Sequence, residues 1–234
     1  MDFSRNNFVF RLIAYLGVVS ILSCCGNSKV NEGTIEFEVT YPYFNKTGFL
    51  SAMLPDKATM RFKGNKYKME VKKGKAFSSA FLVDCDSKTL TTLFQLGQRR
   101  KYSVMDQSAV NKRLEEKFAK PMYMHTSEGD SIVGFLCRKS VAIFEEMGQP
   151  EATLMYTEQI GIKDPNWCLP YNEITGVLLV YEVEQYGIRM RFTAKKFDPA
   201  PVEDKMLEIP SNYKQVPVND LEREIEEMFS TIVD

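Results

Sequence analysis

The stretch of sequence that decides the fold covers residues 58–105 and reads "ATMRFKGNKYKMEVKKGKAFSSAFLVDCDSKTLTTLFQLGQRRKYSVM". Turn-forming residues divide it at four places: Gly64-Asn65, Lys73-Gly74, residues 84–87 and residues 97–99. The short segments between these turns are rich in aromatic and β-branched residues, which favour strands. Short turns that contain glycine typically join antiparallel strands. The stretch therefore predicts a meander of β-hairpins.

The segments on either side of this meander predict one more strand and a helix. In "TIEFEVTY", residues 34–41, apolar and polar side chains alternate, which is typical of a half-buried strand. Downstream, Val110, Leu114 and Phe118 recur every four residues in "QSAVNKRLEEKFAK". This spacing places them on one face of a helix, which we expect over residues 107–119.

After this helix the sequence returns to strands. The segments "PMYMHTS", "SIVGFLCRKSVAIF" and "ATLMYTEQI" are followed by a long hairpin at residues 176–197. Within it, residues 177–181 are apolar on both faces, so we expect this strand to be covered on both sides. The apolar stripe of the helix expected over residues 107–119 is a candidate to cover one face of this strand. Its side chains would then pack against Val177, Leu179 and Tyr181.

Two further segments frame the long hairpin. The loop at residues 161–174 carries Trp167, the only tryptophan, and its length suits either a lid or a self-packed plug. The chain closes with "VNDLEREIEEMFSTIVD", whose apolar residues form one helical stripe. Asn219 and Glu222 have the spacing of a capping box. We expect an amphipathic helix docked on the domain.

The composition favours one globular domain and excludes nucleic-acid binding. Hydrophobic residues make up 44% of the chain, and the net charge is −1 at pH 7. A balanced charge provides no basic surface for nucleic acid or for anionic membranes. Three cysteines lie beyond the first segment: Cys85, Cys137 and Cys168. We expect all three to be small buried thiols, with Cys137 on a strand face shared with Val133, Phe135, Val141 and Ile143. A bridge between Cys137 and Cys168 is the less favoured alternative.

The first thirty residues predict export. The apolar run at residues 12–22 follows Arg5 and Arg11 and spans only about 16 Å as a helix, too short for a bilayer core of about 30 Å. It ends in "ILSCCGNSKVNEG", which resembles the bacterial lipobox. In one frame Cys24 is the lipidated cysteine, and in the competing frame it is Cys25. This resemblance implies a lipoprotein signal peptide at residues 1–23, a flexible tether at residues 24–32, a single β-rich domain at residues 33–234 and a lipid anchor in the membrane.

No catalytic or metal-binding signature stands out in the remaining sequence. The single histidine, His125, has no cysteine or histidine at zinc-ligand spacing. There is no serine nucleophile elbow and no phosphate-binding loop. We therefore expect a protein that is not an enzyme and that requires no cofactor or metal.

The order of these segments resembles an uncharacterised lipoprotein family of Bacteroidota. The segments that carry the resemblance are the lipobox, "GTIEFEVTYP", "TMRFKGNKYKMEV", "KTLTTLFQLG", "IVGFLCRKSVAIF" and "FDPAPVEDKMLEIPSNYKQV". More distantly, the chain is similar to the LolA/LolB-like superfamily of lipoprotein carriers. That resemblance implies an α+β, mainly antiparallel fold: a curved half-open barrel of about ten strands with a central helix and a C-terminal amphipathic helix. A β-sandwich suits the strand pattern nearly as well.

The resemblance also implies a function and a place in the cell. The chain is expected in the bacterial cell envelope, anchored in the outer membrane on either its periplasmic or its outer face. It would hold an apolar ligand, lipid or acyl chains, in a cavity lined by Val110, Leu114, Phe118, Val177, Leu179 and Tyr181. The alternative is a scaffold or interaction lipoprotein whose barrel is filled by its own side chains.

Overall fold

The structure is a computed structural model that describes residues 29–42, 54–144 and 151–233. The predicted signal peptide and both candidate lipidation sites, Cys24 and Cys25, lie outside these residues. The elements, in chain order, are β1 (Glu32–Thr40), β2 (Lys57–Lys63), β3 (Lys66–Lys73), β4 (Phe77–Asp84), β5 (Thr89–Leu96), β6 (Arg99–Met105), α2 (Gln107–Lys117), β7 (Met122–Ile132), β8 (Phe135–Ile143), β9 (Ala152–Thr157), β10 (Val177–Gln185), β11 (Ile188–Asp198), η3 (Asp204–Leu207), β12 (Lys214–Gln215) and α3 (Val218–Val233).

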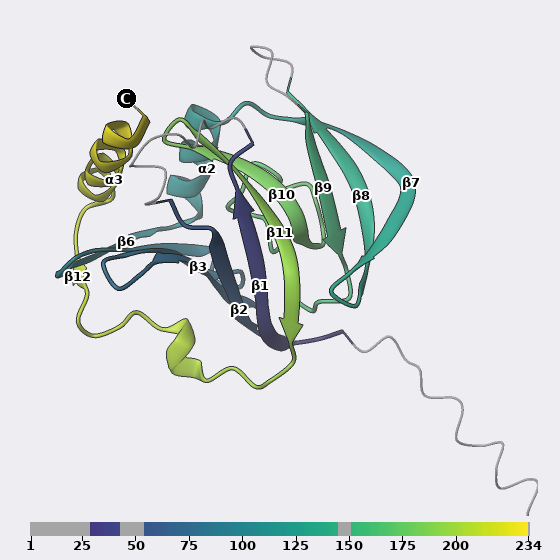
Figure 1. Ribbon diagram of the computed structural model, residues 1–234, viewed down its shortest axis with the longest axis horizontal. Helices are drawn as coiled ribbons and strands as arrows, with labels where there is room; N and C mark the ends of the chain where they lie inside the picture. Colours follow the sequence, from purple (N-terminus) through teal and green to yellow (C-terminus); the bar gives the residue numbers. More distant parts are fainter. Residues whose placement is uncertain (1–28, 43–53, 145–150, 234) are drawn as a thin grey trace, which may run out of the picture.

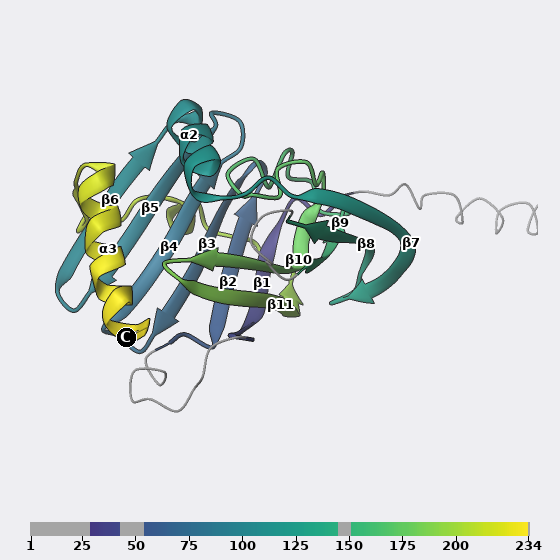
Figure 2. The same ribbon diagram turned by 90° about the horizontal axis from the view of Figure 1, so that it is seen from above.

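All the strands of the described residues belong to one curved sheet. Their order is β12-β6-β5-β4-β3-β2-β1-β11-β10-β9-β8-β7, and the two edges do not pair with each other. Neighbouring strands are antiparallel, except that β12 runs parallel to β6. One continuous open sheet of twelve strands excludes the β-sandwich alternative and exceeds the expected ten. Figures 1 and 2 show α2 and α3 on the same side of this sheet.

The predicted hairpin meander is confirmed, and its turns follow from glycine. Lys63 pairs with Lys66 and Leu96 pairs with Arg99, so each connection contains only two residues. The first residue of each turn is a glycine at positive φ, Gly64 at 57° and Gly97 at 60°. A glycine at this position is what a type II′ hairpin turn requires, because a side chain would clash there. Local sequence therefore sets the register of β2 through β6.

The segment after β11 wraps the sheet from one face to the other. Residues 199–217 pass along the sheet face that carries Lys63, where Asp204 of η3 pairs with Lys63 at 2.7 Å. β12 then extends the sheet beside β6, and α3 crosses the opposite, concave face (Figure 1). There Leu221 and Ile225 of α3 are buried against Phe94. The predicted docked terminal helix is confirmed, but it begins at Val218, so Asn219 lies inside the helix rather than at its cap.

Strand β8 differs from the expected pattern. Phe135 and Cys137 are buried, as expected, but Val141 and Ile143 on the same side of the strand are only half-buried. Ser140 and Ala142 are buried instead, so the buried face changes along the strand. Val133 lies in the turn before β8, at φ 46°. The shared buried face predicted for Cys137 is therefore correct only at the start of the strand.

Candidate functional site

Two adjoining hollows lie on the concave side of the sheet. One is an apolar cavity of about 140 Å³ between the sheet, α3 and the loop at residues 161–174. The other is a polar cleft of about 550 Å³ between α2, α3 and the tip of the β10–β11 hairpin. Arg113, Val183, Gln185 and Tyr186 line both hollows. The cleft is therefore the polar neighbour of the apolar cavity.

Strand periodicity supplies the apolar wall of the cavity. In β3, Tyr67, Met69 and Val71 point to the cavity, while the intervening residues bear charges and point to the opposite face. On the far side of the cavity, Tyr181 of β10 stacks on Phe192 of β11 with ring centres 4.9 Å apart. Ile225 and Phe229 of α3 complete the apolar lining.

The loop at residues 161–174 is a packed roof over this cavity. Its Asn166 side chain donates hydrogen bonds to the carbonyl oxygens of Ile174 (2.7 Å) and Gly176 (2.8 Å). The Tyr67 hydroxyl donates to the Pro165 carbonyl at 2.8 Å, which ties the loop to β3. Trp167 is only 7% exposed. Of the two readings that the sequence left open, the self-packed plug is the correct one.

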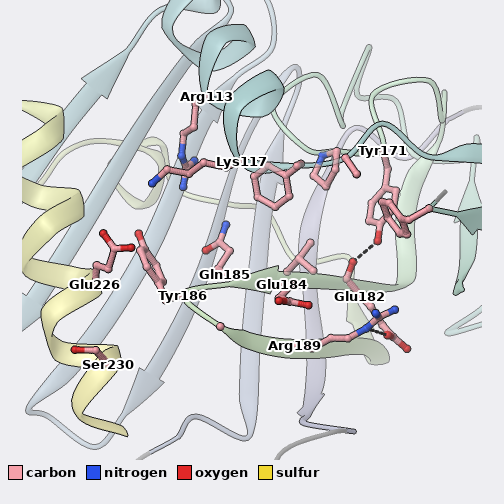
Figure 3. A pocket seen from close by; sticks show the side chains of 16 residues that line it. Arg113, Lys117, Tyr171, Glu182, Glu184, Gln185, Tyr186, Arg189, Glu226 and Ser230 are labelled. Atoms are coloured by element: carbon pink, nitrogen blue, oxygen red, sulfur yellow. Dashed lines mark hydrogen bonds and ion pairs between the residues drawn. The ribbon is translucent and has the colours of Figure 1, made fainter. Parts of the chain in front are cut away.

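The charged and polar side chains of the cleft come mainly from α2, α3 and the β10–β11 hairpin (Figure 3). Arg113 and Lys117 project from α2, Glu226 and Ser230 project from α3, and Glu184 to Tyr186 lie at the hairpin tip. An ion-pair cluster joins the two helices beside the cleft. Glu222 of α3 pairs with Arg113 Nε at 2.8 Å and with Lys117 Nζ at 3.3 Å.

Tyr186 lies where the cleft and the cavity meet. Its φ is 54°, a region that ordinary side chains rarely adopt. The Tyr186 ring stacks on Phe229 of α3 with ring centres 5.4 Å apart, and this contact helps to hold the turn. Burial raises the pKa of Tyr186 to about 12. Gln185 pairs with Ile188, so Tyr186 and Gly187 form a two-residue turn, and their positive φ values of 54° and 73° are those of a type I′ hairpin turn.

A buried ion pair supports the hairpin below the cleft. The Glu182 side chain is 3% exposed and pairs with Arg189 and Arg191, each at 2.5 Å. The Tyr171 hydroxyl donates to the Glu182 carbonyl oxygen at 2.5 Å, so the same residue also holds the roof loop. The Glu182 carboxylate is therefore neutralised within the fold.

The structure brings together only some of the predicted cavity residues. Val177 and Tyr181 line the apolar cavity. Leu179 and Val110 are buried in the core, and Leu114 packs against that core, but none of the three lines either hollow. Phe118 is not helical, because α2 ends at Lys117 and Phe118 is its C-cap with extended backbone. Its side chain lines the polar cleft instead.

The apolar helical contacts of the cavity come from α3, through Ile225 and Phe229, whereas α2 contributes only Arg113. Sequence reasoning identified Leu221 and Ile225 as one apolar stripe but did not place that stripe at the cavity. It also missed Arg113, which lines both hollows. No local signal distinguishes Arg113 from other basic residues on a helix, because its role depends on α3, which is distant in the sequence.

The three cysteines of the described residues are free and buried, so no bridge joins Cys137 to Cys168. Burial raises the pKa of Cys85 to about 12 and that of Cys168 to about 11, and it also raises the pKa of Cys137. In the unfolded chain thiols lose their proton at about pH 8.5. The stabilisation from these neutral thiols is thus fully present below about pH 8.5 and is lost as the pH rises towards the folded values.

We therefore expect the three thiols to resist alkylation in the native protein. At about pH 8.5, iodoacetamide should label Cys85, Cys137 and Cys168 far more slowly in the folded than in the urea-unfolded chain. Mass spectrometry of tryptic peptides measures each site separately. Equal labelling rates in both states at Cys137 would contradict its burial.

Two further features of the described residues bear on the sequence-based expectations. His125 accepts or donates one hydrogen bond, to the Ser140 hydroxyl at 2.7 Å. Within the described residues, no three side chains of the metal-binding types come together as a metal site. No helix in the same residues has the length and hydropathy to cross a membrane.

Comparison with known proteins yields only distant structural likenesses, two of which involve MucB. No protein-family model and no curated protein matches the chain. The crystal structure of MucB in complex with MucA(peri) has 11% sequence identity and a TM-score of 0.34, over 82% of this chain and 59% of that chain. The complex structure of Pseudomonas aeruginosa MucA/MucB has 8% identity and a TM-score of 0.35, over 80% and 58%. This chain thus spans less than two thirds of each solved chain, and likenesses of this degree assign no function to it.

Proposed function

We propose that this chain is a membrane-anchored lipoprotein of the bacterial cell envelope that binds an apolar ligand, lipid or acyl chains, in the hollow of its curved sheet. The observation that carries the proposal is the apolar cavity that adjoins a polar cleft on the concave face. Binding sites typically combine an apolar lining with a few polar groups at one end. The proposed role is binding rather than catalysis.

The size of the cavity limits what it takes up in this conformation. A dry cavity of about 150 Å³ accommodates a molecule the size of benzene. The cavity of about 140 Å³ therefore holds only part of an acyl chain. The rest of the chain would extend towards the cleft, or it would displace Ile225 and Phe229 of α3.

The alternative function is that of an envelope scaffold or interaction lipoprotein. The observation that favours it is that the roof loop and α3 already fill much of the concave face. Trp167, Tyr171 and Leu221 are all buried there. A self-filled sheet of this kind needs no ligand for stability.

Co-purification of lipid separates the two functions. The experiment uses a form that begins at Asn27, made in bacterial cytoplasm and in the periplasm, and analysed by native mass spectrometry and by solvent extraction. Under our proposal, a single-chain lipid or fatty acid accompanies the protein at a fixed ratio. A protein that carries no lipid, and that takes up none when mixed with fatty acid, would support the scaffold.

The anchor is tested separately, by cysteine substitution. Because "ILSC" resembles a lipobox, Cys24→Ala should abolish incorporation of labelled palmitate and release the protein from membranes. Cys25→Ala is the matched control and should leave both properties intact. Loss of label only in Cys25→Ala would show that Cys25, rather than Cys24, is the lipidated cysteine. Equal label in both variants and in the double variant would exclude lipidation at either cysteine.

A further inference from the structure

We propose that the ligand is a single-chain amphiphile with a zwitterionic head, in which a phosphate is followed by an ammonium group. This inference rests on the proposed function and assigns the polar cleft as the site of the head. The apolar tail enters the cavity, and the phosphate lies at the junction marked by Arg113.

One wall of the cleft is basic. Arg113 and Lys117 are one turn apart on α2 and therefore project from the same face of the helix. Both pair with a single carboxylate, that of Glu222. Two cations share one anion, so this wall retains one positive charge. Arg113 also lines the apolar cavity, which places this charge where the tail of an amphiphile would leave the cavity.

The facing walls are acidic. Glu226 on α3 and Glu184 on the hairpin both line the cleft, and both are exposed. In the described part of the chain, neither carboxylate has a basic side chain at ion-pair distance. Glu182 and Arg189 also line the cleft, and Glu182 pairs with both Arg189 and Arg191, so this buried cluster carries one net positive charge below the hairpin. The unpaired charges at the cleft are therefore positive on the α2 wall and negative at Glu226 and Glu184, and the Glu182 cluster partly offsets Glu184, so Glu226 is the main negative charge.

A zwitterionic head satisfies both walls at once. Its phosphate accepts charge-assisted hydrogen bonds from Arg113 and Lys117, and its ammonium group donates to Glu226 or Glu184. A purely anionic head would leave these two carboxylates without a partner and would be repelled by them. An uncharged head would leave all the charges unpaired. Because the cleft is open and solvent screens its charges, the expected preference is a few-fold rather than absolute.

The test compares heads that share one tail. Lysophosphatidylethanolamine and lysophosphatidylglycerol with the same acyl chain are titrated into the lipid-free protein, and dissociation constants are measured by calorimetry at low salt. Free phosphoethanolamine, which has the head without the tail, is the third probe. We expect the ethanolamine lipid to bind about fivefold more tightly than the glycerol lipid, and the free head to bind far more weakly than either.

Substitutions in the acidic wall identify the source of the preference. In Glu184→Gln/Glu226→Gln, the ethanolamine lipid should lose its fivefold advantage, while the glycerol lipid should bind no more weakly than before. Lys117→Gln should weaken both lipids. The matched control, Glu115→Gln/Glu208→Gln, removes two exposed carboxylates that line neither hollow and should change nothing.

The possible results separate this inference from the proposed function. Two results would contradict a preference for a zwitterionic head while leaving lipid binding intact. One is equal binding of the two lipids, and the other is an advantage of the ethanolamine lipid that persists in Glu184→Gln/Glu226→Gln. If neither lipid and no fatty acid binds, the proposed function fails as well. Free phosphoethanolamine that binds as tightly as its lipid would contradict a ligand held by its tail.

Discussion

Glu182→Met is expected to lower the free energy of unfolding by about 3–5 kcal/mol, the usual cost of removing one partner from a buried ion pair. Glu182 is 3% exposed, and the side chain of Arg189 that it pairs with is 9% exposed. The substitution keeps a side chain of similar size but takes away the carboxylate that pairs with Arg189 and Arg191. Urea unfolding followed by tryptophan fluorescence measures the change.

Two further variants show whether the ion pair is the cause. Glu184→Gln, two residues along the same strand, removes an exposed carboxylate and should change stability by less than about 0.5 kcal/mol. Glu182→Met/Arg189→Met replaces the two buried charges with apolar groups, leaves only the half-exposed Arg191, and should recover more than half of the loss. A double variant that is less stable than Glu182→Met would show that the loss has another origin.

Phe192→Ala is expected to cost about 3–5 kcal/mol in the lipid-free protein, and added oleate should offset much of that loss. Phe192 lines the apolar cavity and stacks on Tyr181, so its removal enlarges the space available to a ligand. A ligand at a hundred times its dissociation constant adds about 2.7 kcal/mol of stability. Oleate should therefore stabilise Phe192→Ala more than it stabilises the unsubstituted protein.

Phe62→Ala is the matched control for this experiment. Phe62 is fully buried and stacks on Phe197, but it does not line the cavity. Its loss should cost a similar amount, and oleate should stabilise the variant no more than the unsubstituted protein. Thermal unfolding with and without oleate measures both variants. If oleate stabilises neither the unsubstituted protein nor Phe192→Ala, the result would favour the scaffold function over ligand binding.

Short-range patterns predicted the parts of this fold that depend on neighbours in sequence. Alternation placed Ile35, Phe37 and Val39 on the buried face of β1. Glycine turns set the hairpins of β2 through β6, and the doubly apolar run at residues 177–181 is covered on both faces, as expected. These features follow from backbone geometry and from the apolar content of each face. The sequence contains both directly.

The end of α2 shows where such a pattern fails. The four-residue spacing continues to Phe118, but the helix ends at Lys117. Pro121 follows closely and restricts the backbone before it. Phe118 therefore continues the four-residue apolar pattern without belonging to the helix, and its side chain lines the cleft instead.

By itself, the sequence determined that this chain forms a hairpin-rich sheet with a central helix and an amphipathic terminal helix. Its segment "ILSCC" resembles a lipobox and predicts lipidation at Cys24, with Cys25 as the alternative. Only the tertiary structure decided that α3 returns to the concave face, that Phe229 stacks on Tyr186, and that Arg113 and Lys117 share Glu222. Periodicity records which face of an element is apolar, but not which distant element covers it. The cavity and the charges of the cleft arise from such distant pairings, and no local pattern contains them.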